Sequence, residues 1–196
     1  MAGERNVVIV TGIPGVGKTT VINTAVQMVK DKHDEEVLIL TIGTEMFEIA
    51  SERGFITDRD ELRKMPTARQ REVQRLAGEE ITRKAKTARV IVDTHTLIQT
   101  KNGFLIGLPE WVAKPIQPKT VVLVEADPEK IAGRRTSDES RTRDAQLTDE
   151  IDTHQRMCRA AAVAVGTITG ATVRIIKNRE GKVEEAASEL AATLME

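Results

Sequence analysis

Gly12-Ile13-Pro14-Gly15-Val16-Gly17-Lys18-Thr19 is a complete G-x-x-x-x-G-K-[ST] loop, and it decides how the rest of this 196-residue chain is interpreted. The apolar segment Val7–Val10 precedes the loop and predicts a buried parallel strand. After the loop, apolar residues recur at helical spacing between Thr20 and Val29. Strand, glycine-rich turn and helix form the setting in which this motif binds phosphate, because the loop N–H groups and the helix N-terminus then point at the anion.

The loop therefore predicts a site for a nucleoside triphosphate. Lys18 is expected to reach the β- and γ-phosphates, and the Thr19 hydroxyl is expected to hold Mg²⁺. The predicted nucleotide-binding residues are those of the loop and the residue after it: Gly12, Ile13, Pro14, Gly15, Val16, Gly17, Lys18, Thr19 and Thr20.

Composition narrows the class of protein. A formal net charge of −1 argues against nucleic acid as a general partner. The single cysteine, Cys158, cannot form an intramolecular disulfide and is typical of a reducing compartment, where we expect it to pack in the core. No signal-peptide segment or membrane-length apolar run occurs in the sequence. We therefore expect a cytoplasmic protein that uses neither a membrane nor nucleic acid as partner.

Strand and helix signals alternate along the chain, which predicts an α/β fold: a five-stranded parallel sheet with helices on both faces, forming one domain over residues 1–196. The strands after the first are expected at Glu36–Ile42, Arg89–His95, Thr120–Pro128 and Thr172–Asn178, and the later helices at about 149–166 and 183–194.

Two inserted segments interrupt this alternation of strands and helices. An all-helical insert spans about 43–86, with breaks near Gly54 and at Met65-Pro66, and an arginine-rich loop spans about 134–144. Both leave from the carboxyl edge of the sheet, where ligands of such folds bind. We expect the insert to roof an acceptor site and the loop to act as a lid over the phosphates.

Several motifs resemble those of archaeal-type adenylate kinases. They are the phosphate loop, Asp93-Thr94-His95-Thr96 with Gly103 and Gly107-Leu108-Pro109 beyond it, and Gly170-Ala171-Thr172-Val173. The resemblance implies a nucleoside-monophosphate kinase of the P-loop fold that converts ATP and AMP reversibly into two ADP with Mg²⁺, as a homo-oligomer, often a trimer. The short lid lacks a four-cysteine site, so zinc is not expected.

The resemblance also assigns catalytic roles. Arg134, Arg141 and Arg143 match the lid arginines of the family and, with Lys18, would neutralise the phosphates during transfer. A solvated charged loop is the alternative interpretation of these arginines.

Asp93, at the end of a buried strand, is the second predicted Mg²⁺ ligand, directly or through water; capping of the following loop is the alternative. For His95 we favour hydrogen-bonded support over proton transfer, since phosphoryl transfer needs no strong base.

The resemblance also indicates acceptor residues. Gly43-Thr44 is similar to the place where the family holds AMP, so Thr44 is expected to contact AMP, and Arg63 in the insert is expected to meet the AMP phosphate. Gln99 is expected either to contact the adenine edge or to cap its loop. The remaining basic residues nearby, which compete with Arg63, are Arg59, Lys64, Arg69 and Arg71, and the loop expected to line the ATP base is Asn178-Arg179-Glu180-Gly181.

Three functions other than adenylate kinase are compatible with a phosphate loop. A GTPase is disfavoured because the base-reading motif N-K-x-D is absent from the sequence. Another nucleoside-monophosphate kinase, such as a cytidylate kinase, remains the nearest alternative. A non-metabolic ATP-binding assembly factor would keep the loop but would not need an acceptor pocket.

Overall fold

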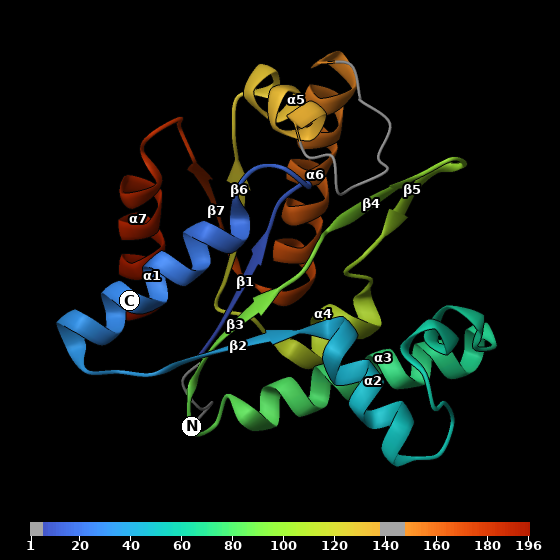
Figure 1. Cartoon of the computed structure of the whole chain (residues 1–196). Coiled ribbons are helices and arrows are strands. Elements are labelled where there is room, and N and C mark those ends of the chain that lie inside the picture. Colours follow the sequence, from blue (N-terminus) through green and yellow to red (C-terminus); the bar gives the residue numbers. More distant parts are fainter. Residues whose placement is uncertain (1–5, 138–147) are drawn as a thin grey trace.

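The computed structural model describes residues 6–137 and 148–196, without the side chains of Arg63 and of residues 135–137. Its centre is a five-stranded sheet in the order β2-β3-β1-β6-β7, with every neighbouring pair parallel (Figure 1). The predicted five-stranded parallel sheet is confirmed. Its strands are β1 (Val7–Thr11), β2 (Val37–Thr41), β3 (Arg89–Asp93), β6 (Thr120–Glu125) and β7 (Thr172–Lys177).

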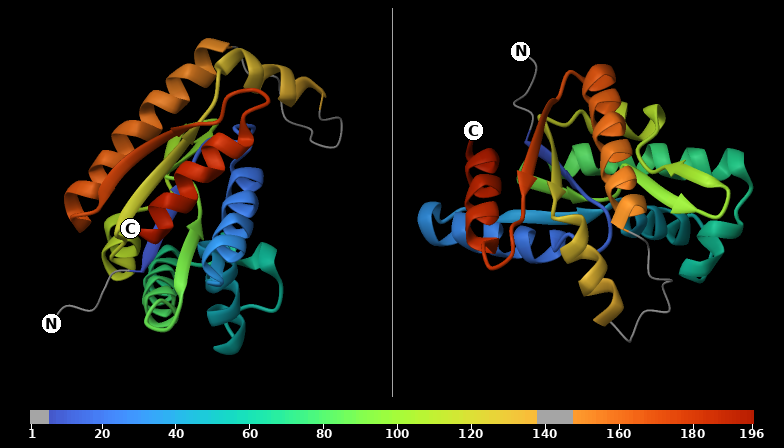
Figure 2. Two further views of the ribbon diagram at one scale, coloured as in Figure 1. Left: turned by 90° about the vertical axis from the view of Figure 1, so that its left-hand side faces the viewer. Right: turned by 90° about the horizontal axis from the view of Figure 1, so that it is seen from above.

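Helices cover both faces of the sheet, as predicted (Figure 2). On one face α1 (Lys18–His33) packs along α7 (Val183–Met195), and on the other α6 (Thr148–Thr169) packs on β6 and β7. The central strands β1 and β6 are buried along their whole length, because a strand covered on both faces has no side for polar residues. No helix among the described residues is long and apolar enough to span a membrane.

The predicted helical insert consists of α2 (Ile42–Glu52), a 3₁₀ helix η1 (Arg59–Lys64) and α3 (Thr67–Lys84), with breaks where the sequence placed them. One boundary differs from the prediction. Gly43 and Thr44 do not close the second strand but lie in the first turn of α2, because the Thr41 hydroxyl caps that helix by accepting a hydrogen bond from the Thr44 N–H.

A β-hairpin and a short helix after β3 were not predicted. Strands β4 (Leu97–Thr100) and β5 (Gly103–Ile106) pair antiparallel, and α4 (Glu110–Ile116) follows. The signal was present, since Asn102-Gly103 between two apolar runs is a strong short-range mark of a hairpin.

The first residues of the expected lid are helical. Residues 134–137 belong to α5 (Pro128–Ser137), so the prediction of a loop starting at Arg134 is wrong for these residues. Pro128 suits the first position of a helix, and the Asp127 carboxylate accepts a hydrogen bond from the Glu129 N–H, which stabilises the helix start. The rest of the expected lid, residues 138–144, lies outside the described residues.

Candidate active site

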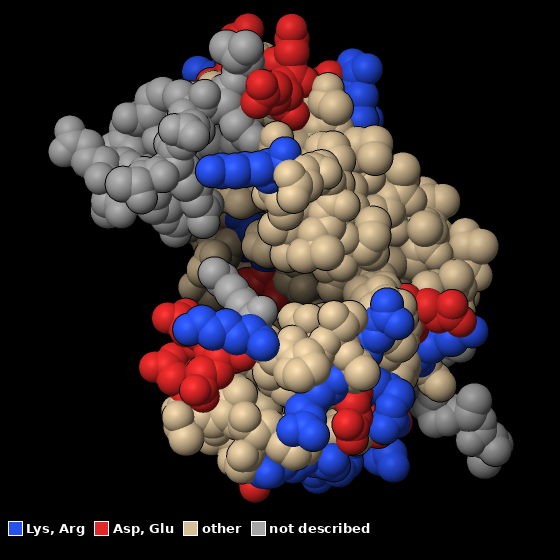
Figure 3. All heavy atoms as spheres, turned by 90° about the vertical axis from the view of Figure 1, so that its right-hand side faces the viewer, with Lys and Arg blue, Asp and Glu red and all other residues tan. Residues whose placement is uncertain are grey.

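The carboxyl ends of β1, β2 and β3 open into a cavity of about 630 Å³. Figure 3 shows the molecule hollowed on this face, with basic and acidic side chains deep in the hollow. Three segments that are distant in sequence meet here because the strand order places β1, β3 and β2 side by side. The lining residues are Ile13, Pro14, Gly15, Gly17, Lys18, Thr19, Thr20, Thr41, Ile42, Gly43, Asp93, Thr94 and His95.

The phosphate loop has the backbone that anion binding requires. Gly15 and Gly17 have φ angles of 96° and 81°, which residues with a side chain rarely adopt, and α1 begins at Lys18. Asn178, just after β7, supports the loop: it is buried, and its Nδ2 donates to the Val16 carbonyl at 2.8 Å. A Cβ atom on Gly17 would lie 2.5 Å from that nitrogen. The sequence placed Asn178 near the ATP base but did not reveal this supporting role.

Lys18 and Asp93, predicted from separate parts of the chain, are in direct contact. The Lys18 ammonium forms an ion pair with the Asp93 carboxylate and donates a second hydrogen bond to the Thr94 carbonyl at 3.0 Å. Both side chains remain partly accessible from the cavity, which they line. Thr19 lines the same cavity and is exposed.

Arg134 lies at the edge of the phosphate loop. Its guanidinium donates to the Gly15 carbonyl at 3.2 Å and to the Glu180 carboxylate at 2.7 Å. It therefore bridges α5, the phosphate loop and the loop after β7. The other two predicted lid arginines, Arg141 and Arg143, lie outside the described residues.

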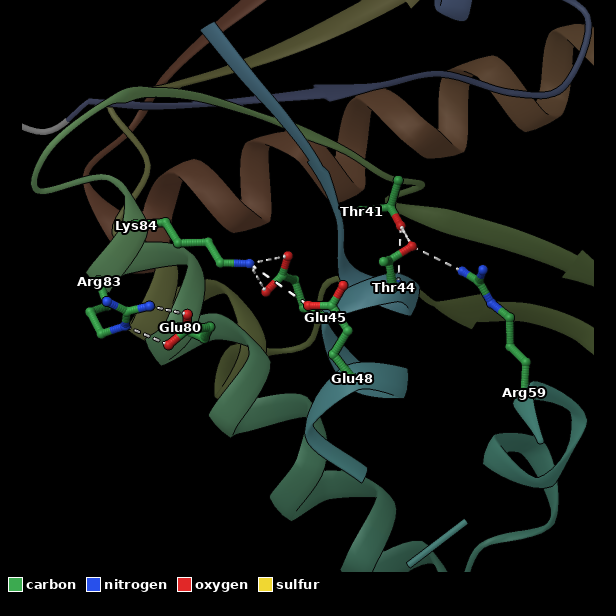
Figure 4. A network of polar contacts seen from close by, with 8 residues as sticks. All are labelled: Thr41, Thr44, Glu45, Glu48, Arg59, Glu80, Arg83 and Lys84. Carbon is green, nitrogen blue, oxygen red and sulfur yellow. Dashed lines mark hydrogen bonds and ion pairs between the residues drawn. The ribbon is translucent and has the colours of Figure 1, made fainter. Parts of the chain in front are cut away.

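In the helical insert, where the acceptor residues were predicted, Arg59 reaches the first turn of α2. Its Nη2 donates to the Thr44 hydroxyl at 3.1 Å, and the Thr41 and Thr44 hydroxyls are 2.8 Å apart (Figure 4). A Cβ atom on Gly43, which lines the cavity, would lie 3.5 Å from the same Arg59 nitrogen. The guanidinium is thus held beside the cavity wall.

The other predicted acceptor residues are less close to the cavity or less fully described. Arg63 lies on η1 with Arg59, but its side chain is outside the described part of the chain. Gln99 lies on β4 of the exposed hairpin and does not line this cavity. Two competing arginines stack on aromatic rings instead: Arg69 lies 4.5 Å from the centre of the Phe55 ring, and Arg71 lies 4.7 Å from that of Trp111.

A buried ion pair holds α2 against α3 on the side away from Arg59 (Figure 4). Glu45, only 2% exposed, accepts hydrogen bonds from the Lys84 ammonium through both carboxylate oxygens, at 2.9 and 2.8 Å. Burial by itself lowers the pKa of Lys84, but the hydrogen bond to Glu45 and the attraction of Glu45, Glu48 and Glu80 outweigh it and raise that pKa. The pair fixes the turn that carries Thr44.

The donor set of the cavity fits Mg²⁺. Thr19 contributes a hydroxyl and Asp93 a carboxylate, which are the oxygen ligands this hard cation prefers beside phosphates. Within residues 6–137 and 148–196 there is no group of three or more His, Cys, Asp and Glu side chains that could hold a metal by itself.

Solved structures share the fold at low sequence identity. Shikimate kinase from Bacteroides thetaiotaomicron aligns with a TM-score of 0.53 and 16% identity over 97% of this chain and 98% of that one. Shikimate kinase from Acinetobacter baumannii, in complex with shikimate, aligns with a TM-score of 0.57 and 15% identity over 98% and 94%. At this identity the likeness concerns the fold alone.

Sequence relatives are much closer. A family model described as an AAA domain matches residues 11–152. The chain is 46% identical to the adenylate kinase of Methanocaldococcus jannaschii over 97% of this chain and 99% of the relative. It is 44% identical to that of Methanococcus vannielii over 97% and 99%, and 46% identical to that of Methanopyrus kandleri over 96% and 97%. The resemblance and the enzyme class predicted from the motifs are confirmed, and the chain belongs to the adenylate kinase family.

Proposed function

We propose that this adenylate kinase transfers the terminal phosphoryl group of ATP to AMP, reversibly, giving two ADP and so balancing the adenine nucleotides. The observation that carries the proposal is that one cavity is walled both by a phosphate loop and by the N-terminus of a second helix, α2. Transfer between two nucleotides requires two phosphate sites facing a common space.

The phosphate loop forms the donor side. Its N–H groups and the N-terminus of α1 would bind the β- and γ-phosphates, with Lys18 following the charge that moves with the transferred group. The Lys18 ammonium has three N–H donors and gives two of them to Asp93 and the Thr94 carbonyl, so a phosphate oxygen would take the third donor or replace Asp93.

Mg²⁺ would be held by Thr19 and Asp93, where it would neutralise charge on the phosphate oxygens. Release of Asp93 from Lys18 would free that carboxylate for the cation.

The start of α2 forms the acceptor side. Ile42 and Gly43 line the cavity in the first helical turn, whose N–H groups favour an anion. Arg59 stands beside them, and its planar fork of donors matches a phosphate. We propose that the AMP phosphate binds here, with Thr44 and Arg59 in contact and with Arg63 joining from η1. Gln99, on the hairpin, would contact the adenine edge rather than the phosphate.

Arginines after α5 would complete the site. Arg141 and Arg143 would neutralise the transferring phosphoryl group, in the roles that the sequence assigned to them. Arg134 is held between the Gly15 carbonyl and Glu180, beside the phosphate loop. From there it would neutralise charge on the ATP phosphates.

We further propose a cytoplasmic homotrimer. The resemblance to archaeal-type kinases implies the trimer, and exposed apolar side chains would supply an interface: Ile98, Leu105 and Ile106 on the hairpin, and Met157, Val163 and Ile168 on α6. Light scattering of the purified protein would measure the mass directly.

The deciding experiment is a coupled assay of ADP formation from ATP with AMP, CMP, UMP or GMP. We expect AMP to be phosphorylated fastest and turnover to require Mg²⁺. A preference for CMP would make the protein a different nucleoside-monophosphate kinase. ATP hydrolysis that no monophosphate accelerates would favour the assembly-factor alternative.

A further inference from the structure

The end of β3 is joined to both ends of the phosphate loop. Thr94 N donates to the Val10 carbonyl at 3.1 Å, and Thr96 N donates to the Thr11 hydroxyl at 2.9 Å. Farther along the loop, Lys18 contacts Asp93 and the Thr94 carbonyl. The loop is therefore fastened at its beginning and at its end to residues 93–96.

His95 contacts Gly12, the first residue of the phosphate-loop motif. Its Nδ1 lies 2.8 Å from the Gly12 carbonyl oxygen. A carbonyl can only accept a hydrogen bond, so Nδ1 must carry the proton and donate it. From its other side Gly12 is pressed against β6, where a Cβ atom would lie 2.7 Å from the Val124 carbonyl oxygen. Gly12 is thus held between the two strands that flank β1.

His95 is in turn held by the segment that returns from the hairpin. Gly107 N donates to the Thr96 carbonyl at 2.9 Å. A Cβ atom at Gly107 would lie 2.0 Å from the His95 carbonyl oxygen, so only glycine allows the two backbones to come this close. The sequence motifs Asp93-Thr94-His95 and Gly107-Leu108-Pro109 are therefore two halves of one packing arrangement.

We propose that His95 is a positioning residue for the phosphate loop: its Nδ1–H, set in place by Gly107, fixes the Gly12 peptide and so aims the loop N–H groups at the ATP phosphates before ATP binds. Such preorganisation lowers the cost of ordering the loop around the anion. The inference rests on the proposed ATP site but adds a residue outside the phosphate-loop motif to it.

Three substitutions of His95 that differ in where they place a hydrogen-bond donor test this positioning role. The amide nitrogen of His95→Asn can occupy the place of Nδ1, whereas that of His95→Gln lies one bond farther out and His95→Ala has no donor. We expect His95→Asn to keep the Kd and KM for ATP within about twofold, whereas His95→Gln and His95→Ala raise both about fivefold, as loss of a partly buried hydrogen bond does. The KM for AMP should change less than that for ATP. His33→Ala, on the exposed end of α1, is the control.

Gly107→Ala tests the second half of the arrangement. Its methyl group would displace the His95 backbone, so it should raise the Kd for ATP as His95→Ala does, although Gly107 does not line the cavity. Gly133→Ala, where a Cβ atom would meet nothing within 4 Å among the residues that the structure describes, is the matched control. Thermal unfolding followed by circular dichroism identifies a variant that fails to fold, in which case the His95 series decides alone.

Two results would overturn the inference: His95→Asn as impaired as His95→Ala, which would indicate that the imidazole contacts ATP directly from the cavity wall, or His95→Ala with the Kd for ATP of the wild type. A wild-type protein that binds no ATP in the same titration would instead refute the proposed function, so the two failures are distinguishable.

Discussion

The donor and acceptor sides of the cavity are built in different ways. The proposed donor side consists of consecutive residues, Gly12 to Thr19, and would bind through backbone N–H groups whose directions are set by glycine φ angles. The proposed acceptor side gathers Thr41, which lines the cavity, with Thr44 and Arg59 just behind the wall, and would rely on their side chains. A backbone site can therefore be identified from a short motif, whereas a side-chain site appears only when the chain has folded.

The two sides of the cavity also differ in which parts of the fold support them. Contacts from β3 and from Asn178 after β7 surround the phosphate loop, so the central sheet fixes the donor side. The acceptor turn is supported from within the insert, by Arg59 on one side and by Lys84 through Glu45 on the other. We therefore expect changes on the donor side to affect catalysis more strongly than equivalent changes on the acceptor side.

The largest expected effect is that of Lys18→Ala. Removing this charge should cost about 3–5 kcal/mol of transition-state stabilisation, which is roughly a 10²–10⁴-fold loss of kcat. ATP binding without Mg²⁺ should suffer less than turnover. Steady-state kinetics measure both, with Lys32→Ala on the exposed end of α1 as a control. Turnover within tenfold of the wild type would mean that Lys18 serves Asp93 rather than the phosphates.

Arg59 and Arg63 provide the corresponding test of the acceptor side. If Arg59 contacts the AMP phosphate, Arg59→Ala should raise the KM for AMP about 10–100-fold while leaving the KM for ATP nearly unchanged, since a charged hydrogen bond contributes about 1.5–3 kcal/mol. Arg63→Ala, one turn along η1, should also raise the KM for AMP more than that for ATP if both arginines bind. Equal increases for the two substrates would indicate that the arginine concerned only supports the insert.

The sequence predicted more of the donor side than of the acceptor side. Lys18, Thr19 and Asp93 were identified because a motif and a strand end place them, and the structure brings them into one cavity. Arg59 was only one of several competing basic residues, since a helical charge pattern does not distinguish an arginine that bonds the first turn of α2 from one that stacks on an aromatic ring. The support from Asn178 could not be predicted, because it joins residues on opposite ends of the chain.

A smaller effect is expected from Asn178→Ala. Loss of the hydrogen bond to the Val16 carbonyl should raise the KM for ATP several-fold, because about 1–3 kcal/mol is at stake when a buried acceptor loses its donor. The KM for AMP should change less. Asn178→Ala would then affect mainly ATP, whereas Arg59→Ala would affect mainly AMP. Asn102→Ala, at the exposed hairpin turn, is the control. Equal increases in the KM for ATP and the KM for AMP would mean that Asn178 stabilises the whole cavity rather than the phosphate loop alone.

The smallest expected effect concerns the start of η1, the helix that carries Arg59 and Arg63, the two arginines proposed to bind AMP. The Glu61 carboxylate accepts hydrogen bonds from the N–H groups of Thr57 and Asp58 at 2.7 and 3.2 Å, closing a capping box. These bonds hold the pKa of Glu61 below its ordinary value of 4.5. A carboxyl group with a lowered pKa stabilises the fold above its unfolded pKa and loses that contribution as the pH falls through the folded value.

The turn that begins η1 should therefore keep its cap down to pH 4.5 and lose it only at lower pH. In NMR titrations, the Glu61 carboxyl signal and the amide signals of Thr57 and Asp58 should move together with one midpoint below 4.5. Glu61→Gln should abolish the shared transition of the two amides and leave the phosphate-loop amides unchanged. A Glu61 midpoint at or above 4.5 would show that the box does not form in solution, and the position of Arg59 would then depend on its bond to Thr44 alone.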